Sequence, residues 1–179
     1  MDPIIVIGDK APQFELKDLR GEVYSSAGMG GLIIVLNFWS AECVWCERVD
    51  HEILGYLNEW KEQVKVLWIA SSANESRELI EIAANQRSLP VVLLDEQQQV
   101  ANLYGVETTP QFFVVDAKGI LAYQGSWDDV TFRQRVATRV YVPEVVEALM
   151  KDLTPRISQS PPYGCVLVRF PDANGYQQL

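Results

Sequence analysis

The feature that most limits the fold of this chain is a pair of cysteines, Cys43 and Cys46, placed between an apolar run and an amphipathic stretch. The run before them, residues 32–38, has the length and composition of a buried strand. The stretch after them, residues 44–62, repeats its apolar side chains with the period of a helix. The pair therefore lies where a buried strand passes into a helix, which is the context in which a CxxC motif carries redox chemistry.

The start of a helix suggests how the two thiols divide the work. Unpaired N–H groups and the positive end of the helix dipole favour the thiolate of Cys43, which is the form that attacks disulfides. Cys43 is expected to be the exposed member of the pair, and Cys46, one turn further in, to resolve the mixed disulfide. Glu42 and the uncharged pair Val44 and Trp45 favour the thiol, so we expect a more reducing couple than in strong oxidants. A static disulfide or two inert buried thiols is the alternative.

The rest of the chain alternates strand and helix patterns. The N-terminal segment has Phe14 and Leu16 pointing inward, and a turn follows it at 18–21. Beyond the CxxC helix, the patterns predict a strand at 64–70, a helix at 76–86, a strand at 90–94, a short helix at 97–104, a strand hairpin at 111–115 and 120–123, a helix at 142–151 and a strand-like stretch at 165–170. This order predicts an α/β fold.

Composition excludes several classes of function. The chain has 179 residues, 48% of them apolar, and a net charge of -9, which fits one domain that does not bind nucleic acid. The longest apolar run, residues 31–39, is too short to span a membrane. Three cysteines and one histidine are too few for a closed zinc site, so we expect no metal and no other cofactor. The first ten residues lack the pattern of a secretory signal, which favours a cytoplasmic location, or an extracytoplasmic one if a signal or anchor has been removed.

Two motifs, NFWSAECVWC and TTPQFFVVDAKG, resemble the thioredoxin superfamily, and most of all its TlpA-like or redoxin-like branch. The opening GDKAPQFELKDLRGE is similar to the start of redoxins. The resemblance implies a thioredoxin fold, with a central mixed β-sheet flanked by helices and an N-terminal strand extension. It covers residues 8–151 of a single domain, 1–179, and leaves 152–179 as a C-terminal extension.

The resemblance also implies a set of site residues. Cys43 would be the nucleophile and Cys46 the resolving thiol, and the two would form the redox-active disulfide. A cis peptide bond between Thr109 and Pro110 would face them and pair with an extended substrate. Apart from the resemblance, the bulk of Trp45 near the helix tip favours contact with the partner, with simple packing as the alternative. The family's acidic residue is missing, because Asn37 stands where thioredoxins have an aspartate and Val49 where the TlpA-like branch has a glutamate.

Asp50 is the candidate for the missing acid. At about 100 degrees per residue, it falls about 40 degrees from Cys46, inside the apolar arc of the helix. Buried there, it could accept or return the proton of the resolving thiol. Alternatively, it turns to solvent or pairs with a lysine or arginine. Glu47 is the second candidate, and His51 is expected on the surface.

The function predicted is reduction of disulfide-containing protein substrates by a monomer that an external thiol donor recycles. A thiol peroxidase is one alternative, although the Pro-x-x-x-Thr-x-x-Cys pattern of peroxidases is absent around Cys43 and Cys46. A non-enzymatic, redox-regulated binding module is another. Cys165 is expected to be a small buried hydrophobe, with a second resolving thiol or an intermolecular disulfide as alternatives.

Overall fold

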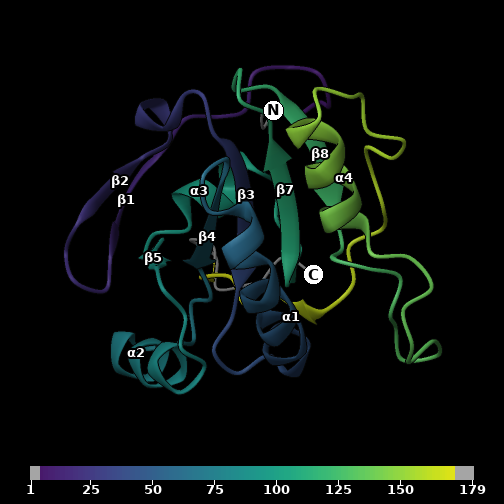
Figure 1. Cartoon of the computed structure of the whole chain (residues 1–179). Helices are drawn as coiled ribbons and strands as arrows, with labels where there is room; N and C mark the ends of the chain where they lie inside the picture. Colours follow the sequence, from purple (N-terminus) through teal and green to yellow (C-terminus); the bar gives the residue numbers. More distant parts are fainter. Residues whose placement is uncertain (1–4, 172–179) are drawn as a thin grey trace.

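The computed structural model describes residues 5–171, and it is built around a seven-stranded mixed sheet with the order β2-β1-β5-β4-β3-β7-β8 (Figure 1). The strands of this sheet are β1 Glu15–Asp18, β2 Val23–Ser25, β3 Ile33–Trp39, β4 Val64–Ala70, β5 Val92–Leu94, β7 Gln111–Val115 and β8 Leu121–Gly125. The helices are α1 Val44–Trp60, α2 Arg77–Gln86, α3 Gln99–Leu103 and α4 Tyr141–Met150, with a 3-10 turn at Ser26–Met29.

The strand before Cys43, β3, lies inside the sheet, and its seven residues are all buried. It pairs in parallel with β4 and antiparallel with β7. A strand buried on both faces needs apolar side chains on both sides, which is why this segment is apolar at every position but Asn37 rather than alternating. The active-site helix α1 begins a few residues after the end of this strand.

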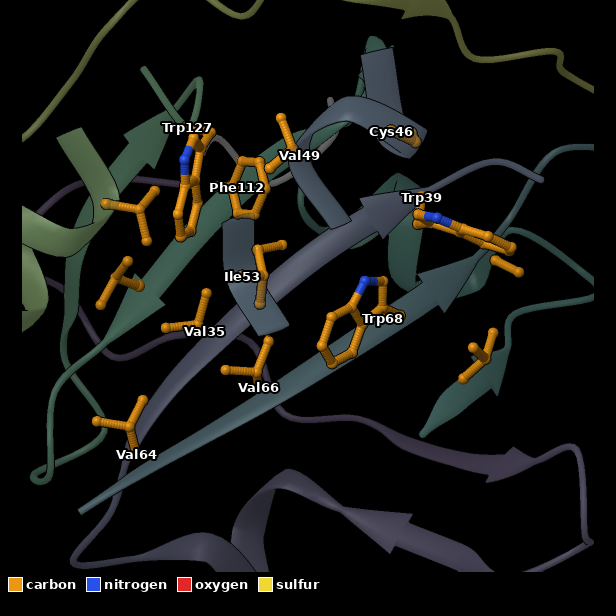
Figure 2. Packing of buried hydrophobic residues seen from close by; sticks show 14 of the residues in the cluster. Val35, Trp39, Cys46, Val49, Ile53, Val64, Val66, Trp68, Phe112 and Trp127 are labelled. Atoms are coloured by element: carbon orange, nitrogen blue, oxygen red, sulfur yellow. The ribbon is translucent and has the colours of Figure 1, made fainter. Parts of the chain in front are cut away.

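Helices cover the two faces of the sheet unequally. On one face, α1, α2 and α4 bury their apolar side chains against alternate residues of β3, β4 and β7. Figure 2 shows this layer, with Ile53 of α1 next to Val35 and Val66 of the sheet and Val49 beside Phe112. On the other face, α3 and the N-terminal segment around Phe14 form a second cluster.

A second, two-stranded sheet joins parts of the chain that are far apart in sequence. Its strands are β6 Thr108–Thr109 and β9 Cys165–Val166, which run antiparallel. The segment after α4 turns back along the molecule and ends in β9, close to α1 (Figure 1, yellow). The part of the C-terminal extension that ends in β9 is therefore packed onto the domain, against β6 just before β7.

The long connection between β8 and α4, residues 126–140, has no regular element, and an ion pair ties it to α1. Arg48 donates two hydrogen bonds of 2.9 Å to the carboxylate of Asp128 and a third, of 3.1 Å, to Glu52. Asp128 is buried, whereas Arg48 is only half-buried. Such a two-pronged contact fixes geometry better than a single bond, so it holds the connection beside the start of α1.

The α/β class and the thioredoxin fold predicted from the sequence are confirmed. The strands at 64–70 and 111–115 have the predicted bounds. The other predicted elements differ by one or two residues at their ends; the helix from residue 44, for example, stops at Trp60 rather than 62. The largest difference is the last strand, which covers only Cys165–Val166 rather than 165–170. After Val166, the N–H of Leu167 donates to Glu107, and the carbonyl oxygen of Val168 accepts from Ala73 and Gln98. These partners come from separate segments, so no single strand of the described chain extends β9.

Candidate active site

Cys43 lies at the N-terminus of α1, directly against the loop that precedes β7. It is the residue immediately before the helix, with an extended backbone at φ -85° and ψ 117°. Its Sγ lies 3.1 Å from the carbonyl oxygen of Thr109. The peptide bond between Thr109 and Pro110 is cis, as the family resemblance predicts. The predicted nucleophile and the predicted substrate edge are therefore in contact.

The disulfide present in this structure is not the predicted one. Cys43 is bonded to Cys165, with 6.1 Å between their Cα atoms, and Cys46 is a free thiol. The expectation that Cys43 is exposed was wrong for this state, because its exposed fraction is 2%. The expectation that Cys165 only fills space was also wrong. Both errors have one cause: the C-terminal extension crosses the start of α1 and covers Cys43. A Cys43–Cys46 disulfide stays a prediction for another redox state.

Cys46 is enclosed and is held as a thiol. Its side chain has no exposed surface, and its Sγ accepts a 3.4 Å hydrogen bond from the backbone N–H of Ser40. Burial raises the pKa of the Cys46 thiol far above its usual range, and the negative charge of Asp50 raises that pKa further. The N–H of Ser40 opposes this shift without overcoming it. The resolving thiol therefore needs help to lose its proton.

Asp50 lies inside the apolar layer, as the helical arc predicts, with 1% of its surface exposed. The indole N–H groups of Trp39 and Trp68 each donate a 2.8 Å hydrogen bond to its carboxylate, and Arg87 donates a third of 3.1 Å. Burial raises the pKa of the Asp50 carboxyl, and these three donors limit the rise. The alternative prediction, pairing with an arginine, is thus also confirmed, while the proton-accepting role stays a prediction.

The ion pair between Asp50 and Arg87 gives a test of this network. We expect Arg87→Met to lower the free energy of unfolding by about 3 kcal/mol, because removing one partner leaves a buried carboxylate without its counter-ion. Urea unfolding followed by circular dichroism measures the change. Arg133→Met, at an exposed position, is the control. A loss equal to that of the control would show that the two indole groups suffice to hold the carboxylate.

The other candidates named from the sequence lie around this centre. Trp45 is half-buried and packs edge-to-face on Tyr163 of the C-terminal extension, with 5.0 Å between ring centroids. It lines an open cavity of about 350 Å³ together with residues of α1 and of the 126–140 connection: Arg48, Val130, Thr131, Phe132 and Arg135. Glu47 and His51 are exposed on the outer side of α1. Neither of these two approaches the thiols by a hydrogen bond among the residues the structure describes.

Sequence reasoning missed two charged residues of the site. Arg87 follows α2 and donates to the backbone carbonyl of Ala41 as well as to Asp50. Glu75 accepts hydrogen bonds from the hydroxyl of Ser40 and from the backbone N–H of Glu42, at 2.5 and 3.0 Å. Glu75 lies in the loop before α2 and Arg87 directly after α2, so no local spacing relates either of them to the CxxC. Their shared contact is the loop that joins β3 to α1.

Within residues 5–171, no cluster of three or more potential metal-binding side chains is present, and no helix is long and apolar enough to cross a membrane. The chemistry this part of the chain offers is that of three cysteines at one helix end. One sulfur, on Cys43, can be reached from two sides: by Cys46 from within α1 and by Cys165 from the extension. Exchange of disulfide bonds needs this kind of arrangement.

Comparison with known proteins places these features in a family. Over 121 residues the chain is 33% identical to the thiol-disulfide oxidoreductase ResA of Geobacillus thermodenitrificans, an alignment that covers 64% of this chain and 66% of that protein. The chain therefore matches just under two thirds of that relative's length. The predicted chemistry, exchange between thiols and disulfides, agrees with the name of this relative.

Solved structures match over more of the chain. An uncharacterized conserved protein from Geobacillus kaustophilus superimposes with a TM-score of 0.86 at 25% identity, covering 97% of this chain and 95% of its own. A putative thiol:disulfide interchange protein DsbE from Chlorobium tepidum gives a TM-score of 0.61 at 26% identity, covering 67% and 84%. The model of the AhpC/TSA family matches residues 7–124. The redoxin-like resemblance predicted from the sequence is confirmed, and the chain belongs to the AhpC/TSA family.

Proposed function

We propose that this protein is a thiol-disulfide oxidoreductase that reduces disulfide bonds in other proteins. The observation that carries the proposal is the position of Cys43, at the N-terminus of α1 with its sulfur 3.1 Å from the carbonyl oxygen of Thr109. The helix end stabilises a thiolate, and the backbone of Thr109 next to cis-Pro110 offers an edge to an extended substrate.

In the proposed reaction, the Cys43 thiolate attacks one sulfur of a substrate disulfide and releases the other as a thiolate, which takes up a proton. Cys46 then loses its proton and attacks the sulfur of Cys43. The Cys43–Cys46 disulfide forms, and the second substrate thiol leaves reduced. An external thiol donor returns two electrons to the pair. No group beyond the thiols and a proton acceptor is required.

The charges near Cys43 support the reducing direction. Glu42 is adjacent in sequence, and the carboxylate of Glu75 binds the backbone N–H of Glu42. Two acidic groups beside the helix start oppose a strongly stabilised thiolate, which strong oxidants of this fold depend on. Equilibration of the protein with a reference dithiol measures the potential. A value near or below about -250 mV would support a reductase, whereas one near about -120 mV would indicate an oxidant.

Activity assays separate this proposal from its two rivals. Turnover of insulin disulfides with dithiothreitol as donor is the result expected for the reductase. Consumption of hydrogen peroxide without insulin reduction would instead identify a thiol peroxidase. A single stoichiometric reaction with no turnover in excess insulin would identify a redox-regulated binding module.

Trp45 is proposed to contact the protein substrate. We expect Trp45→Ala to raise the KM for insulin about tenfold with little change in kcat, because an aromatic side chain that the substrate would bury is lost from its side of the site. Both proteins are compared in a Cys165→Ser background, so that the C-terminal extension is not bonded to Cys43. A small disulfide is too short to extend from Cys43 into the cavity beside Trp45. Trp45→Ala and its parent should therefore reduce it equally well.

His51→Ala, on the exposed side of the same helix, is the control for the Trp45 measurement. An unchanged KM for insulin in Trp45→Ala would limit Trp45 to packing against Tyr163.

The compartment and the oligomeric state are part of the proposal: a monomer that works in the cytoplasm, where thiol donors keep dithiols reduced. Light scattering after size-exclusion chromatography tests the oligomeric state, and cell fractionation tests the compartment. A stable dimer, or recovery with the extracytoplasmic fraction, would contradict them.

A further inference from the structure

The C-terminal extension is attached along the whole active-site end of the molecule. Ser160 bonds to Gln124 and Ser126 at the end of β8, with N···O distances of 3.1 and 2.9 Å. Further on, Tyr163 packs on Trp45 and accepts a 2.7 Å hydrogen bond from the backbone N–H of Phe132. Beyond the cysteine, Leu167 is buried and its N–H donates to Glu107. Residues 160–167 of the extension are thus docked on the domain, and we call this segment the strap.

In its middle, this strap pairs with the edge that the proposed function gives to the substrate. In the β6–β9 sheet, Cys165 stands opposite Thr109, and Val166 opposite Thr108. Within the described residues, β9 is the sole strand partner of β6. An extended peptide that adds a strand to a free edge is a common mode of recognition. The chain's own residues 164–167 therefore occupy the place of a bound substrate strand.

The disulfide completes the likeness to a bound substrate. Cys165 is bonded to Cys43 while its backbone pairs with Thr109, and Cys46 remains a free thiol one turn along α1. A nucleophile bonded to a cysteine of a strand on the substrate edge, with the resolving thiol still reduced, is the arrangement of a mixed disulfide awaiting resolution.

We propose that the segment around Cys165 is a built-in substrate of the Cys43/Cys46 pair, and that Cys165 is a third redox-active cysteine. The inference rests on the proposed function of that pair. In the exchange, Cys46 gives up its proton and attacks Cys43, so that the Cys43–Cys46 bond forms as the Cys43–Cys165 bond breaks. Cys165 leaves as a thiolate and takes up a proton. One disulfide and one thiol are present before and after, so no oxidant or reductant is consumed.

The exchange decides whether the site is open. While Cys43 is bonded to Cys165, the nucleophile is blocked and the Thr108–Thr109 edge is covered, so an external disulfide cannot bind. A strap tethered to the domain competes at a high effective concentration. Once the strand of a mixed-disulfide substrate has left the Thr108–Thr109 edge, Cys165 can also attack the sulfur of Cys43 and release the substrate thiol.

Gly164 provides a way to undock the strap without touching a cysteine. A Cβ at this position would lie 2.7 Å from the carbonyl carbon of Thr109 and 3.1 Å from Cδ of Pro110, and the backbone of Thr109 cannot move aside cheaply. Gly164→Ala should therefore disfavour docking through steric overlap alone. Gly28 has nothing within 4 Å of the corresponding position, so Gly28→Ala is the matched control.

The experiment maps the disulfides of the full chain. Wild type and variants are equilibrated over a series of oxidised and reduced glutathione ratios, acid-quenched, alkylated and analysed by peptide mass spectrometry. Wild type should contain both Cys43–Cys165 and Cys43–Cys46, in a ratio that is restored after either form is enriched. Cys46→Ser should accumulate Cys43–Cys165. Gly164→Ala should shift the ratio toward Cys43–Cys46 by about tenfold, and Gly28→Ala should not shift it.

Insulin reduction supplies the second readout. Gly164→Ala and Cys165→Ser should both lower the apparent KM, by about tenfold, because the tethered competitor is weakened or cannot bond. If Gly164→Ala does not fold, Cys165→Ser still decides the point. Absence of Cys43–Cys165 in both wild type and Cys46→Ser, or a Cys43–Cys165 bond that never exchanges, would overturn the inference even when insulin is reduced. Reversible exchange in a protein that does not reduce insulin would overturn the proposed function alone.

Discussion

Replacing Cys43 with Ser is expected to lower the rate of insulin reduction by roughly 10³-fold or more, to the background rate of the thiol donor. Cys43 is the thiol that lies at the N-terminus of α1 and against Thr109. Cys46 cannot take its place, because it has no exposed surface and burial raises its pKa far above the usual range. Steady-state reduction of insulin by dithiothreitol, followed by turbidity, measures the effect.

A trapping experiment checks that this loss reflects the nucleophile and not the fold. Two thiols can reach the sulfur of Cys43, so the double variant Cys46→Ser/Cys165→Ser should retain a covalent adduct with insulin. Cys46→Ser alone should retain much less, because Cys165 releases the substrate. His51→Ala serves as the activity control. Recovery of the adduct on Cys46 in Cys43→Ser would mean that the roles of the first two cysteines are reversed.

The sequence predicts the core of the fold well because that core follows local patterns. The bounds of β4 and β7 agree with the apolar runs because every residue of the two strands except Lys65 is buried. The helix after Cys43 follows from its own apolar period, and its buried residues, among them Asp50, lie in the arc that this period predicts. Fully buried strands and amphipathic helices leave a strong local signal.

The contacts around the site could not be predicted in the same way, because they join distant parts of the chain. Cys43 and Cys165 are 122 residues apart, and no spacing rule links them. Arg87 reaches Asp50 only because α2 packs on the same face of the sheet as α1. An unpaired acid in an apolar arc signals that a partner is needed, but it does not identify the partner. For the same reason, the sequence could not show that Cys43 is covered.

Asp50 has two possible effects on Cys46, and they act in opposite directions. Its charge raises the pKa of the Cys46 thiol, which opposes attack on Cys43. A carboxylate that accepts the proton, however, becomes neutral as the thiolate forms, and so removes that opposition at the moment of reaction. Its oxygens are already bonded to Trp39, Trp68 and Arg87, so the proton would replace one of these contacts or travel through a water.

Asp50→Asn separates the two effects by the sign of the change. If Asp50 accepts the proton, the variant should slow the step in which Cys46 attacks Cys43 by about 10²-fold near neutral pH, since proton transfer by a positioned group contributes this much or more. If Asp50 acts by charge alone, the same variant should speed that step, because the pKa of Cys46 falls. Rapid-quench measurement of mixed-disulfide decay in a Cys165→Ser background gives the rate.

The pH profile of that step adds an independent check on Asp50, with Trp68→Phe as the matched variant. For an acceptor that works when ionised, the rate rises with pH through the pKa of Asp50, which burial places above the usual range. Trp68→Phe removes an indole donor that favours the charged form, so it should move this rise to higher pH. Asp50→Asn should abolish the rise. A profile that is the same in wild type, Trp68→Phe and Asp50→Asn would exclude Asp50 as the proton acceptor, and Glu47, exposed on the same helix, would be the next residue to replace.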